Sequence, residues 1–277
     1  MPDAPRPFEA GAAPTVRGEL AGEGPAVVLL HGLTATRRYV LHGSRGLERA
    51  GHMVIAYDAR GHGESDPAPA GQGYGYPEMA DDLGAVLAEA VGERRFVLAG
   101  HSMGAHTAIA YALRRPPGLA GLVIAGPAYD GETTEGGLAY WDGLAQGLEQ
   151  GGLEGFLARL DEQSETGEEW RETVLRFTRE RMERHRDLDA VAAALRQAPR
   201  SRPFGSLRDL ESLELPALVV ASHDEADPGH PRAVAEAYAE HLPEARLVGE
   251  GEGESPLAWQ GGRLSREVAA FCAELAF

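Results

Sequence analysis

The pentapeptide GHSMG at positions 100–104 has the pattern of a serine held on a sharp turn. The apolar run Phe96–Ala99 before it is typical of a buried strand, and Ala105–Leu113 after it has the composition of a helix. A strand-to-helix turn this tight needs small flanking residues, and the two outer glycines meet that need. The hydroxyl then projects at the end of the sheet, where the N-terminus of the new helix favours developing negative charge. This pattern predicts nucleophilic catalysis by Ser102.

Four segments, one of which contains this pentapeptide, are similar to segments of a known family. They are VVLLHG at 27–32, YDARGHGESD at 57–66, LAGHSMG at 98–104 and ELPALVVASHDEADP at 214–228. On these motifs the chain resembles the α/β-hydrolase superfamily, in particular its small bacterial serine esterases and cofactor-free peroxidase relatives. The resemblance covers nearly the whole chain. It implies a mainly parallel central sheet flanked by helices, with a helical cap inserted into it.

The resemblance also implies an oxyanion hole. The dipeptide His31-Gly32 ends the first buried strand, and the backbone N–H of Leu33 would be one donor. The N–H of Met103, directly after the nucleophile, would be the second donor. Two donors matter because negative charge on the carbonyl oxygen appears only in the tetrahedral state, and loss of one commonly costs about 10²–10³ in rate.

The glycine-rich loop at 58–65 invites a phosphate-binding interpretation, but its glycine spacing does not match a nucleotide-binding fingerprint. The chain contains no lysine, which excludes a P-loop lysine and a Schiff base. In the resembling family this loop is structural, which implies that Asp58 and Arg60 brace neighbouring loops. We therefore predict a protein that uses no cofactor and no metal.

A serine hydroxyl needs a base, which is ordinarily an imidazole oriented by a carboxylate. Asp224 is the predicted carboxylate because it lies three residues beyond the apolar run Leu218–Ala221, and Pro228 follows it as in the family. Glu225 and Asp227 lie in the same loop, so a shift of one to three residues could give either of them this role. We interpret these two neighbours as solvated loop carboxylates.

The usual histidine is missing. The family places it in the loop after the last strand, here Arg246–Val248, and Glu254 stands at the expected position. No shift in alignment supplies a histidine, because the last one in the chain, His241, precedes that strand. We therefore predict Glu254 as the third catalytic residue. It would be a weak base, since an ordinary Glu has a pKa near 4.3, although burial beside Asp224 would raise it.

Other histidines remain alternatives. His230 lies six residues after the predicted acid and His223 immediately precedes it, although both are expected to cap or flank the next helix. His106 lies four residues after the nucleophile, so its proximity keeps it a candidate, whereas His101 adjoins the nucleophile and is expected to point away. The remaining histidines are expected in structural, loop or surface positions: His31, His42, His52, His62 and His185.

The elements that must position these residues follow from the alternation of short apolar runs with helical patterns, which is typical of a mainly parallel sheet covered by helices. The predicted strands are Val27–Leu30, Met53–Tyr57, Phe96–Ala99, Leu122–Ala125, Leu218–Ala221 and Arg246–Val248. The predicted helices are Glu78–Val91, Met103–Leu113, Ala233–Leu242 and Leu264–Phe277. The stretch 130–213 breaks the alternation and is predicted to be a helical cap. The hydrolase core would then comprise residues 1–129 and 214–277.

Composition narrows the class of protein. The 277 residues are 43% hydrophobic and 25% charged, as in a globular chain with a sizeable core. A formal charge of −17 opposes binding to nucleic acid or to an anionic membrane. The chain shows neither a signal peptide nor an apolar run of membrane-spanning length, and its single cysteine, Cys272, fits a reducing compartment. We expect a cytoplasmic protein whose partner is a small-molecule substrate.

Two classes of function fit these residues. The first is a serine hydrolase that acts on an ester or thioester of a small molecule through Ser102, with Asp224 and Glu254 as its partners. The alternative lacks an activated serine: a protein that binds a ligand without changing it, or an enzyme with lyase- or cyclase-like chemistry. Loss of one triad member can still leave about 10³–10⁴-fold catalysis. The sequence therefore favours the hydrolase.

Overall fold

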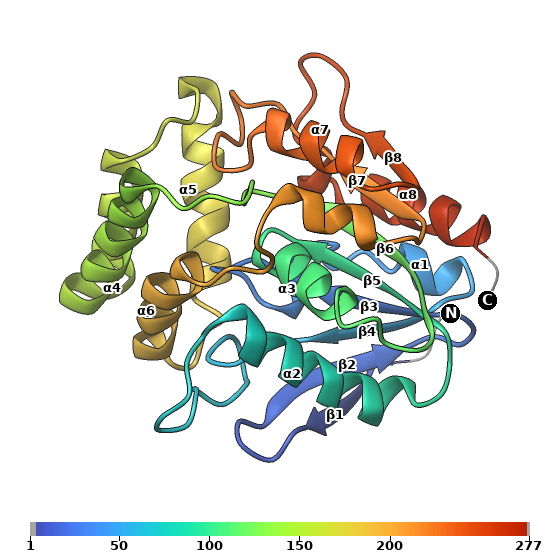
Figure 1. The fold of residues 1–277 in the computed structure, drawn as a ribbon. Helices are drawn as coiled ribbons and strands as arrows, with labels where there is room; N and C mark the ends of the chain where they lie inside the picture. Colours follow the sequence, from blue (N-terminus) through green and yellow to red (C-terminus); the bar gives the residue numbers. More distant parts are fainter. Residues whose placement is uncertain (1–3, 276–277) are drawn as a thin grey trace.

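The chain folds around one central sheet, which Figure 1 shows with helices on both faces and a further group of helices at one end. The computed structural model describes residues 4–275. The strands are β1 (Arg6–Ala10), β2 (Val16–Ala21), β3 (Ala26–Leu30), β4 (Met53–Tyr57), β5 (Phe96–His101), β6 (Leu119–Ala125), β7 (Ala217–Val220) and β8 (Ala245–Val248). Their order in the sheet is β1-β2-β4-β3-β5-β6-β7-β8. The pairs β1–β2 and β2–β4 are antiparallel and the others are parallel, which confirms the predicted mainly parallel α/β fold.

Eight α-helices are found in the described part of the chain. They are α1 (Gly46–Arg49), α2 (Tyr76–Val86), α3 (Met103–Ala112), α4 (Glu135–Glu162), α5 (Glu168–Met182), α6 (Leu188–Gln197), α7 (Arg232–His241) and α8 (Gly261–Ala273). Short turns of helix are η1 (Arg37–Tyr39), η2 (Leu87–Val91), η3 (Ala198–Arg200), η4 (Leu207–Ser212) and η5 (Leu257–Trp259). The predicted final helix extends to residue 277, of which residues 276–277 lie outside the described residues.

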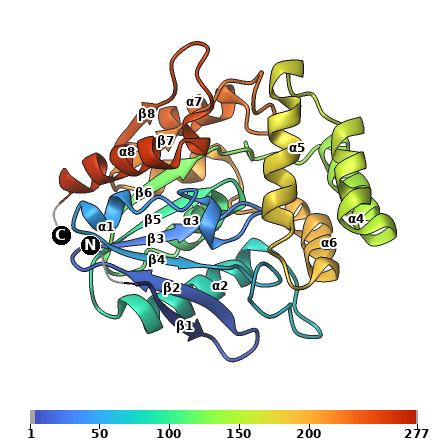
Figure 2. The same cartoon turned by 180° about the vertical axis from the view of Figure 1, so that it is seen from behind.

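The residues of strand β3 are suited to the centre of the sheet because they are apolar on both faces. All five of its side chains are buried, as expected of a strand that helices cover on both faces. Val28 and Leu30 pack into the hydrophobic cluster under α2, α3 and α7. Val27 and Leu29 pack into a second cluster under α1 and α8, the two helices on the face toward the viewer in Figure 2. The period-two alternation of a strand therefore supplies both layers of core from one continuous apolar run.

Helices α4, α5 and α6 belong to the chain segment that connects β6 to β7, and they fall inside residues 130–213. They pack on the loops at one end of the sheet through a third hydrophobic cluster, in which Phe156 and Leu195 join Leu33 and Met103. The long helix α4 is broken at Gly152, whose φ of 58° and ψ of −149° are not helical. No helix in the described part of the chain is long and apolar enough to cross a membrane.

The glycine-rich loop after β4 is a bracing element, as predicted. Asp58 accepts hydrogen bonds from the Arg37 side chain, from the Arg37 amide at 2.7 Å and from the Glu64 amide at 3.0 Å. The buried guanidinium of Arg60 binds both carboxylate oxygens of Asp82, at 2.6 and 2.8 Å. These contacts hold the loop beside the end of β3, where the parallel strands terminate together.

Candidate active site

Ser102 lies at the turn between β5 and α3. Its φ of 52° and ψ of −118° fall in a backbone region that costs about 1–3 kcal/mol for a residue with a side chain. The amide of Ser102 donates to Ala125 O at 2.9 Å, which ties the turn to β6. A Cβ on Gly100 would overlap the Gly104 carbonyl, and a Cβ on Gly104 would overlap the carbonyl oxygen of Leu30. Both glycines are therefore required for the turn to sit against the sheet.

The Ser102 side chain faces two adjoining cavities of about 250 and 470 Å³. Both are also lined by Leu33, Ala128, Gly137 and Trp141, so the two cavities meet at Ser102. The smaller extends toward His106 and Tyr129, and the larger toward the loop after β7 and toward helix α5. Ser102 therefore has room for a group on either side of it.

The predicted oxyanion donors lie beside Ser102. Leu33 follows the end of β3, and Met103 is the first residue of α3. Both residues line the smaller cavity together with Ser102. Neither amide N–H has a hydrogen-bond acceptor among residues 4–275. Two unused donors at a helix N-terminus and at a strand end are the arrangement that stabilises a tetrahedral oxyanion.

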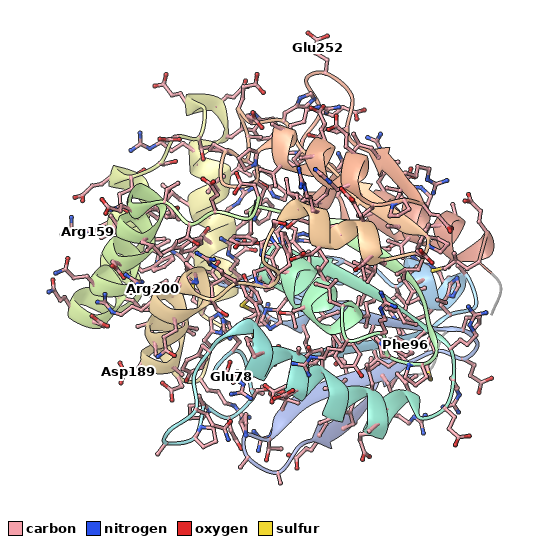
Figure 3. The ribbon with its side chains drawn as sticks, in the orientation of Figure 1. Glu78, Phe96, Arg159, Asp189, Arg200 and Glu252 are labelled. Atoms are coloured by element: carbon pink, nitrogen blue, oxygen red, sulfur yellow. The ribbon has the colours of Figure 1, made fainter. Side chains whose placement is uncertain are left out.

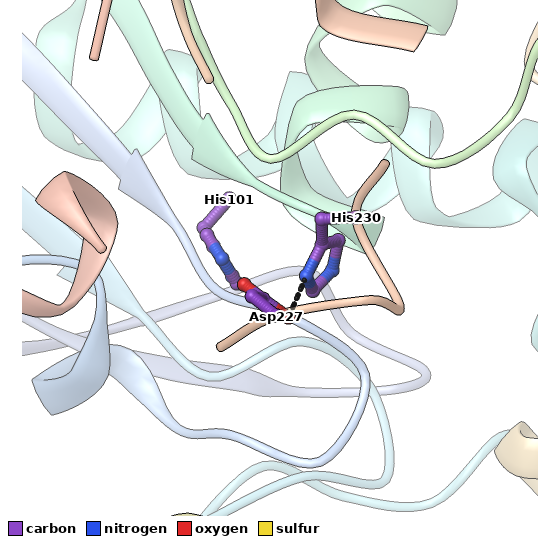
Figure 4. A group of neighbouring side chains, drawn as sticks. All are labelled: His101, Asp227 and His230. Carbon is purple, nitrogen blue, oxygen red and sulfur yellow. Dashed lines mark hydrogen bonds and ion pairs between the residues drawn. The ribbon is translucent and has the colours of Figure 1, made fainter. Parts of the chain in front are cut away.

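The larger cavity contains a hydrogen-bonded imidazole and carboxylate. His230 Nδ1 donates to Asp227 Oδ1 at 2.8 Å, as the dashed line in Figure 4 shows. Burial alone would raise the pKa of Asp227, but the charge and hydrogen bond of His230, followed by His101 and Arg181, leave that pKa below its usual value. An ionised carboxylate can only accept, so Nδ1 of His230 carries the proton and Nε2 carries the lone pair.

His101 lies on the other side of the same carboxylate (Figure 4). Its ring is 4.9 Å from that of His230, and burial, followed by the charge of His230, lowers the pKa of His101 to about 3. One possible metal-ligand atom is offered by each of His101, Asp227 and His230, and these three atoms lie within 4.8 Å of one another. Two neutral imidazoles and a carboxylate are a ligand set that suits a divalent transition metal. Among the described residues, these three side chains form the cluster that could hold a metal ion.

Other histidines near the nucleophile are engaged elsewhere. His106 Nε2 lies 3.2 Å from the amide of Ala128 and 3.3 Å from that of Tyr129, and accepts from both. His31 Nε2 accepts from the Ala59 amide at 2.9 Å. These bonds occupy the lone pairs that a base would need.

Two more histidines, expected in loop or surface positions, are buried in loops. His62 Nε2 donates to Leu33 O at 2.6 Å, and His185 Nδ1 accepts from Gly63 N at 2.9 Å. Both side chains therefore hold loop backbone in place.

The predicted acid and third catalytic residue lie away from Ser102. Asp224 is exposed, and its Oδ1 accepts from the amide of Arg232 at 2.8 Å, at the start of α7. Glu254 is exposed as well, and its carboxylate binds the Gly251 amide at 2.9 Å and the Arg263 side chain. Figure 3 shows Glu252 of the same loop projecting outward from the molecule. The structure therefore does not bring Asp224 or Glu254 to Ser102, because each carboxylate binds within its own loop or to the adjoining helix.

Two further charged residues of the larger cavity, Glu165 and Arg181, were not identified from the sequence. Arg181 belongs to helix α5. It lies seven residues after Val174 and three after Thr178, so all three occupy one face of the helix. That periodicity was visible in the sequence. It did not show that this face turns toward the nucleophile.

The family model described as alpha/beta hydrolase fold matches residues 25–260, and the chain belongs to this family. Over 101 residues the chain is 38% identical to an sn-1-specific diacylglycerol lipase of Mus musculus, which is 36% of this chain and 32% of the lipase. It is 37% identical over 101 residues to epoxide hydrolase B of Mycobacterium tuberculosis, 36% of this chain and 28% of that enzyme. These matches span about a third of each relative.

Solved structures resemble the fold over nearly its full length. An esterase from Thermogutta terrifontis superimposes with a TM-score of 0.77 at 23% identity, covering 98% of this chain and 99% of the esterase. An enol-lactonase from Burkholderia xenovorans gives a TM-score of 0.75 at 20% identity, covering 96% of this chain and 100% of the lactonase. At these identities the likeness establishes the fold alone.

Proposed function

We propose that this protein is a serine hydrolase that cleaves the ester or thioester bond of a small molecule. Ser102 is the nucleophile, His230 is the general base and Asp227 orients its imidazole. The amide N–H groups of Leu33 and Met103 form the oxyanion hole. In this proposal Asp227 and His230 take the roles that the sequence analysis gave to Asp224 and Glu254.

The hydrogen bond between Asp227 and His230 carries this proposal. It lies in the cavity that Ser102 faces, and it leaves Nε2 of His230 without a hydrogen-bond partner among the described residues. Ser102 Oγ forms no hydrogen bond within residues 4–275 either, so both groups are available to each other and to a substrate. Catalytic hydrogen bonds often tighten only when substrate binds. An imidazole oriented by a carboxylate is the base that a serine hydroxyl requires.

The reaction follows from these positions. Ser102 Oγ attacks the carbonyl carbon while His230 Nε2 takes the hydroxyl proton, and the carbonyl oxygen becomes an anion held by the two amide donors. The carbon–oxygen or carbon–sulfur bond then breaks, and His230 returns the proton to the leaving alcohol or thiol. Water attacks the acyl-enzyme by the same route and releases the carboxylic acid. Asp227 stays ionised throughout and stabilises the imidazolium.

The two cavities that meet at Ser102 support a small substrate with a group on either side of the scissile bond. In this proposal the segment 130–213 is the cap that encloses it, and residues 1–129 and 214–277 are the catalytic core. The single cysteine and the net charge of −17 support a cytoplasmic setting without a nucleic acid partner. The diacylglycerol lipase and epoxide hydrolase relatives support hydrolysis as the reaction class.

Hydrolysis of short-chain p-nitrophenyl esters and thioesters tests the proposal. We expect turnover by the wild type and a loss of at least about 10³-fold in Ser102→Ala with the melting temperature unchanged. The exposed Ser212→Ala variant serves as the matched control. Turnover that survives in Ser102→Ala would contradict the proposal.

The same assay separates this mechanism from metal catalysis. We expect EDTA to leave the rate unchanged, and Zn²⁺ to inhibit because a metal bound by His101, Asp227 and His230 would disrupt the pair of His230 and Asp227 that the base requires. A rate that EDTA abolishes and Zn²⁺ restores would assign the chemistry to a metal at His101, Asp227 and His230.

A further inference from the structure

Arg181 carries a positive charge into the cavity beside Ser102. It lies on α5, lines the larger cavity and is mostly buried. Its Nε is completely buried and has no hydrogen-bond partner, and no ion pair or hydrogen bond joins the Arg181 guanidinium to a residue from 4 to 275. Burial lowers the pKa of Arg181 below its usual value, although the nearby Asp227 raises it. An arginine is nevertheless charged at any physiological pH.

Arg60 is a second buried arginine, and its contacts differ from those of Arg181. It binds both oxygens of Asp82 and also donates to Gly73 O at 2.9 Å. Buried charges are ordinarily paired, because leaving one without a partner costs several kcal/mol. Arg181 lacks such partners, so the cavity offers a place for a negative group that the chain does not supply.

Further unsatisfied polar atoms gather around the same cavity. Eight buried side-chain nitrogen or oxygen atoms lack a hydrogen-bond partner in the described chain. Five of them belong to residues that line this one cavity, namely His101 Nε2, Gln163 Oε1, Thr178 Oγ1, Arg181 Nε and Asp227 Oδ2. Buried polar groups are hydrogen-bonded in most native structures, so such a concentration indicates a polar ligand.

We infer that Arg181 binds a carboxylate of the substrate, so that the substrate is a small ester or thioester that also carries a free carboxylate. This inference rests on the proposed function and adds the substrate class. A carboxylate matches the planar fork of a guanidinium, which offers two parallel N–H donors. Thr178, one turn earlier on the same helix, lines the same cavity, and its buried hydroxyl has no hydrogen-bond partner among the described residues.

Two acidic side chains line the cavity and bear on this inference. Asp227 is already bound to His230 and lies beyond ion-pair distance of Arg181. Glu165 is exposed at the rim. The rest of the wall includes the apolar side chains of Trp141, Leu160 and Val174. Arg181 is therefore the group in this cavity that can attract an anion, and the apolar wall can take the remainder of the molecule.

Kinetics with a matched pair of substrates test the inference, namely p-nitrophenyl acetate and the mono-p-nitrophenyl ester of glutaric acid. We expect the wild type to have at least a tenfold higher kcat/KM for the glutarate ester. Arg181→Gln should lower that preference at least tenfold, mainly through KM, and Arg181→Lys should recover part of it because the charge remains but the fork is lost. The matched control is Arg176→Gln, an exposed arginine on the same helix, which should keep the wild-type preference.

Binding of free glutarate, measured by calorimetry, separates this inference from the proposed function. Glutarate should bind the wild type and bind Arg181→Gln at least tenfold more weakly, and this result would support the inference even if neither ester were hydrolysed. Equal kcat/KM for the two esters, together with glutarate affinity that does not depend on Arg181, would overturn it. If both esters are hydrolysed but glutarate affinity does not depend on Arg181, the proposed serine hydrolase remains supported. Only the carboxylate site is then refuted.

Discussion

At the residue scale, two aspartates of one loop have different contacts and therefore different roles. Asp224 is exposed and accepts the amide hydrogen of Arg232 at the start of α7. Asp227 accepts the Nδ1 hydrogen of His230 inside the cavity. The first bond stabilises a helix N-terminus, where a negative charge is favourable, and the second sets the orientation of an imidazole.

Substitution of each aspartate should separate these roles. Asp224→Ala should lower the free energy of unfolding by about 1 kcal/mol, because a helix N-terminus loses its acceptor, while ester hydrolysis stays within about twofold of wild type. Asp227→Asn should lower kcat by about 10²-fold or more, because the amide no longer selects the required tautomer of His230. Urea denaturation and initial-rate kinetics on both variants measure the two effects. An equal loss of activity in the two variants would contradict the assignment.

The positions of Ser102, Leu33 and Met103 beside one cavity were predictable from the sequence, but the partners that we propose for Ser102 were not. Ser102, Leu33 and Met103 were predictable because short motifs next to strand ends fix local backbone. The directions of Asp224 and Glu254 were not, because a side chain in an irregular loop turns toward whatever tertiary partner is nearest. A signal for the alternative was present, since Asp227 and His230 are three residues apart in one loop.

At the element scale, the contact of α3 with β3 determines the position of Ser102. Gly104 lies against the carbonyl oxygen of Leu30, so the helix approaches the strand more closely than any side chain would allow. Met103, the residue before Gly104, has an N–H without an acceptor in the described chain. Close packing of this helix is therefore part of the geometry of the site.

Gly104→Ala tests this contact. The added Cβ would overlap the Leu30 carbonyl, and the backbone shift should cost about 1–3 kcal/mol of unfolding free energy and lower the activity. Gly262→Ala in α8 is the matched control, because a Cβ there meets nothing within 4 Å in the described structure and should be neutral or slightly stabilising. Equal melting temperatures for the two variants would show that the packing argument is wrong.

Elements with one strong periodicity were predictable, and those with mixed signals were not. The buried central strands are continuous apolar runs, so their positions followed from the sequence. Strands β1 and β2 were missed because they form a partly exposed antiparallel edge in which residues such as Arg6 and Glu9 alternate with apolar ones. Helix α4 was not delimited because it is rich in glycine. Gly147 and Gly155 of that helix contact each other across the break at Gly152.

At the scale of the whole molecule, buried neutral histidines couple stability to pH. Burial lowers the pKa of His31, His106 and His185 from 6.5 to about 3, with neighbouring histidines adding to the shift. Between these values the unfolded chain binds protons that the folded protein does not, so acidification favours unfolding. The stabilisation is complete above pH 6.5 and is lost progressively as the pH falls toward 3.

Urea denaturation at pH 7 and at pH 4.5 should show this loss. Each of the three groups contributes up to about 1.4 kcal/mol per pH unit inside the window. His185→Asn should reduce the difference between the two pH values relative to wild type, since one of the groups is removed. An unfolding free energy that is the same at both pH values would refute the coupling.

The rate at which a fluorophosphonate labels Ser102 most directly tests the central claim, that the Asp227–His230 pair activates this serine. Mass spectrometry of intact protein gives the rate constant for wild type, His230→Gln and Glu254→Gln. We expect a labelling rate about 10²–10⁴-fold lower in His230→Gln and unchanged in Glu254→Gln, with both variants folded. Labelling of His230→Gln at the wild-type rate, or loss of labelling in Glu254→Gln, would contradict it.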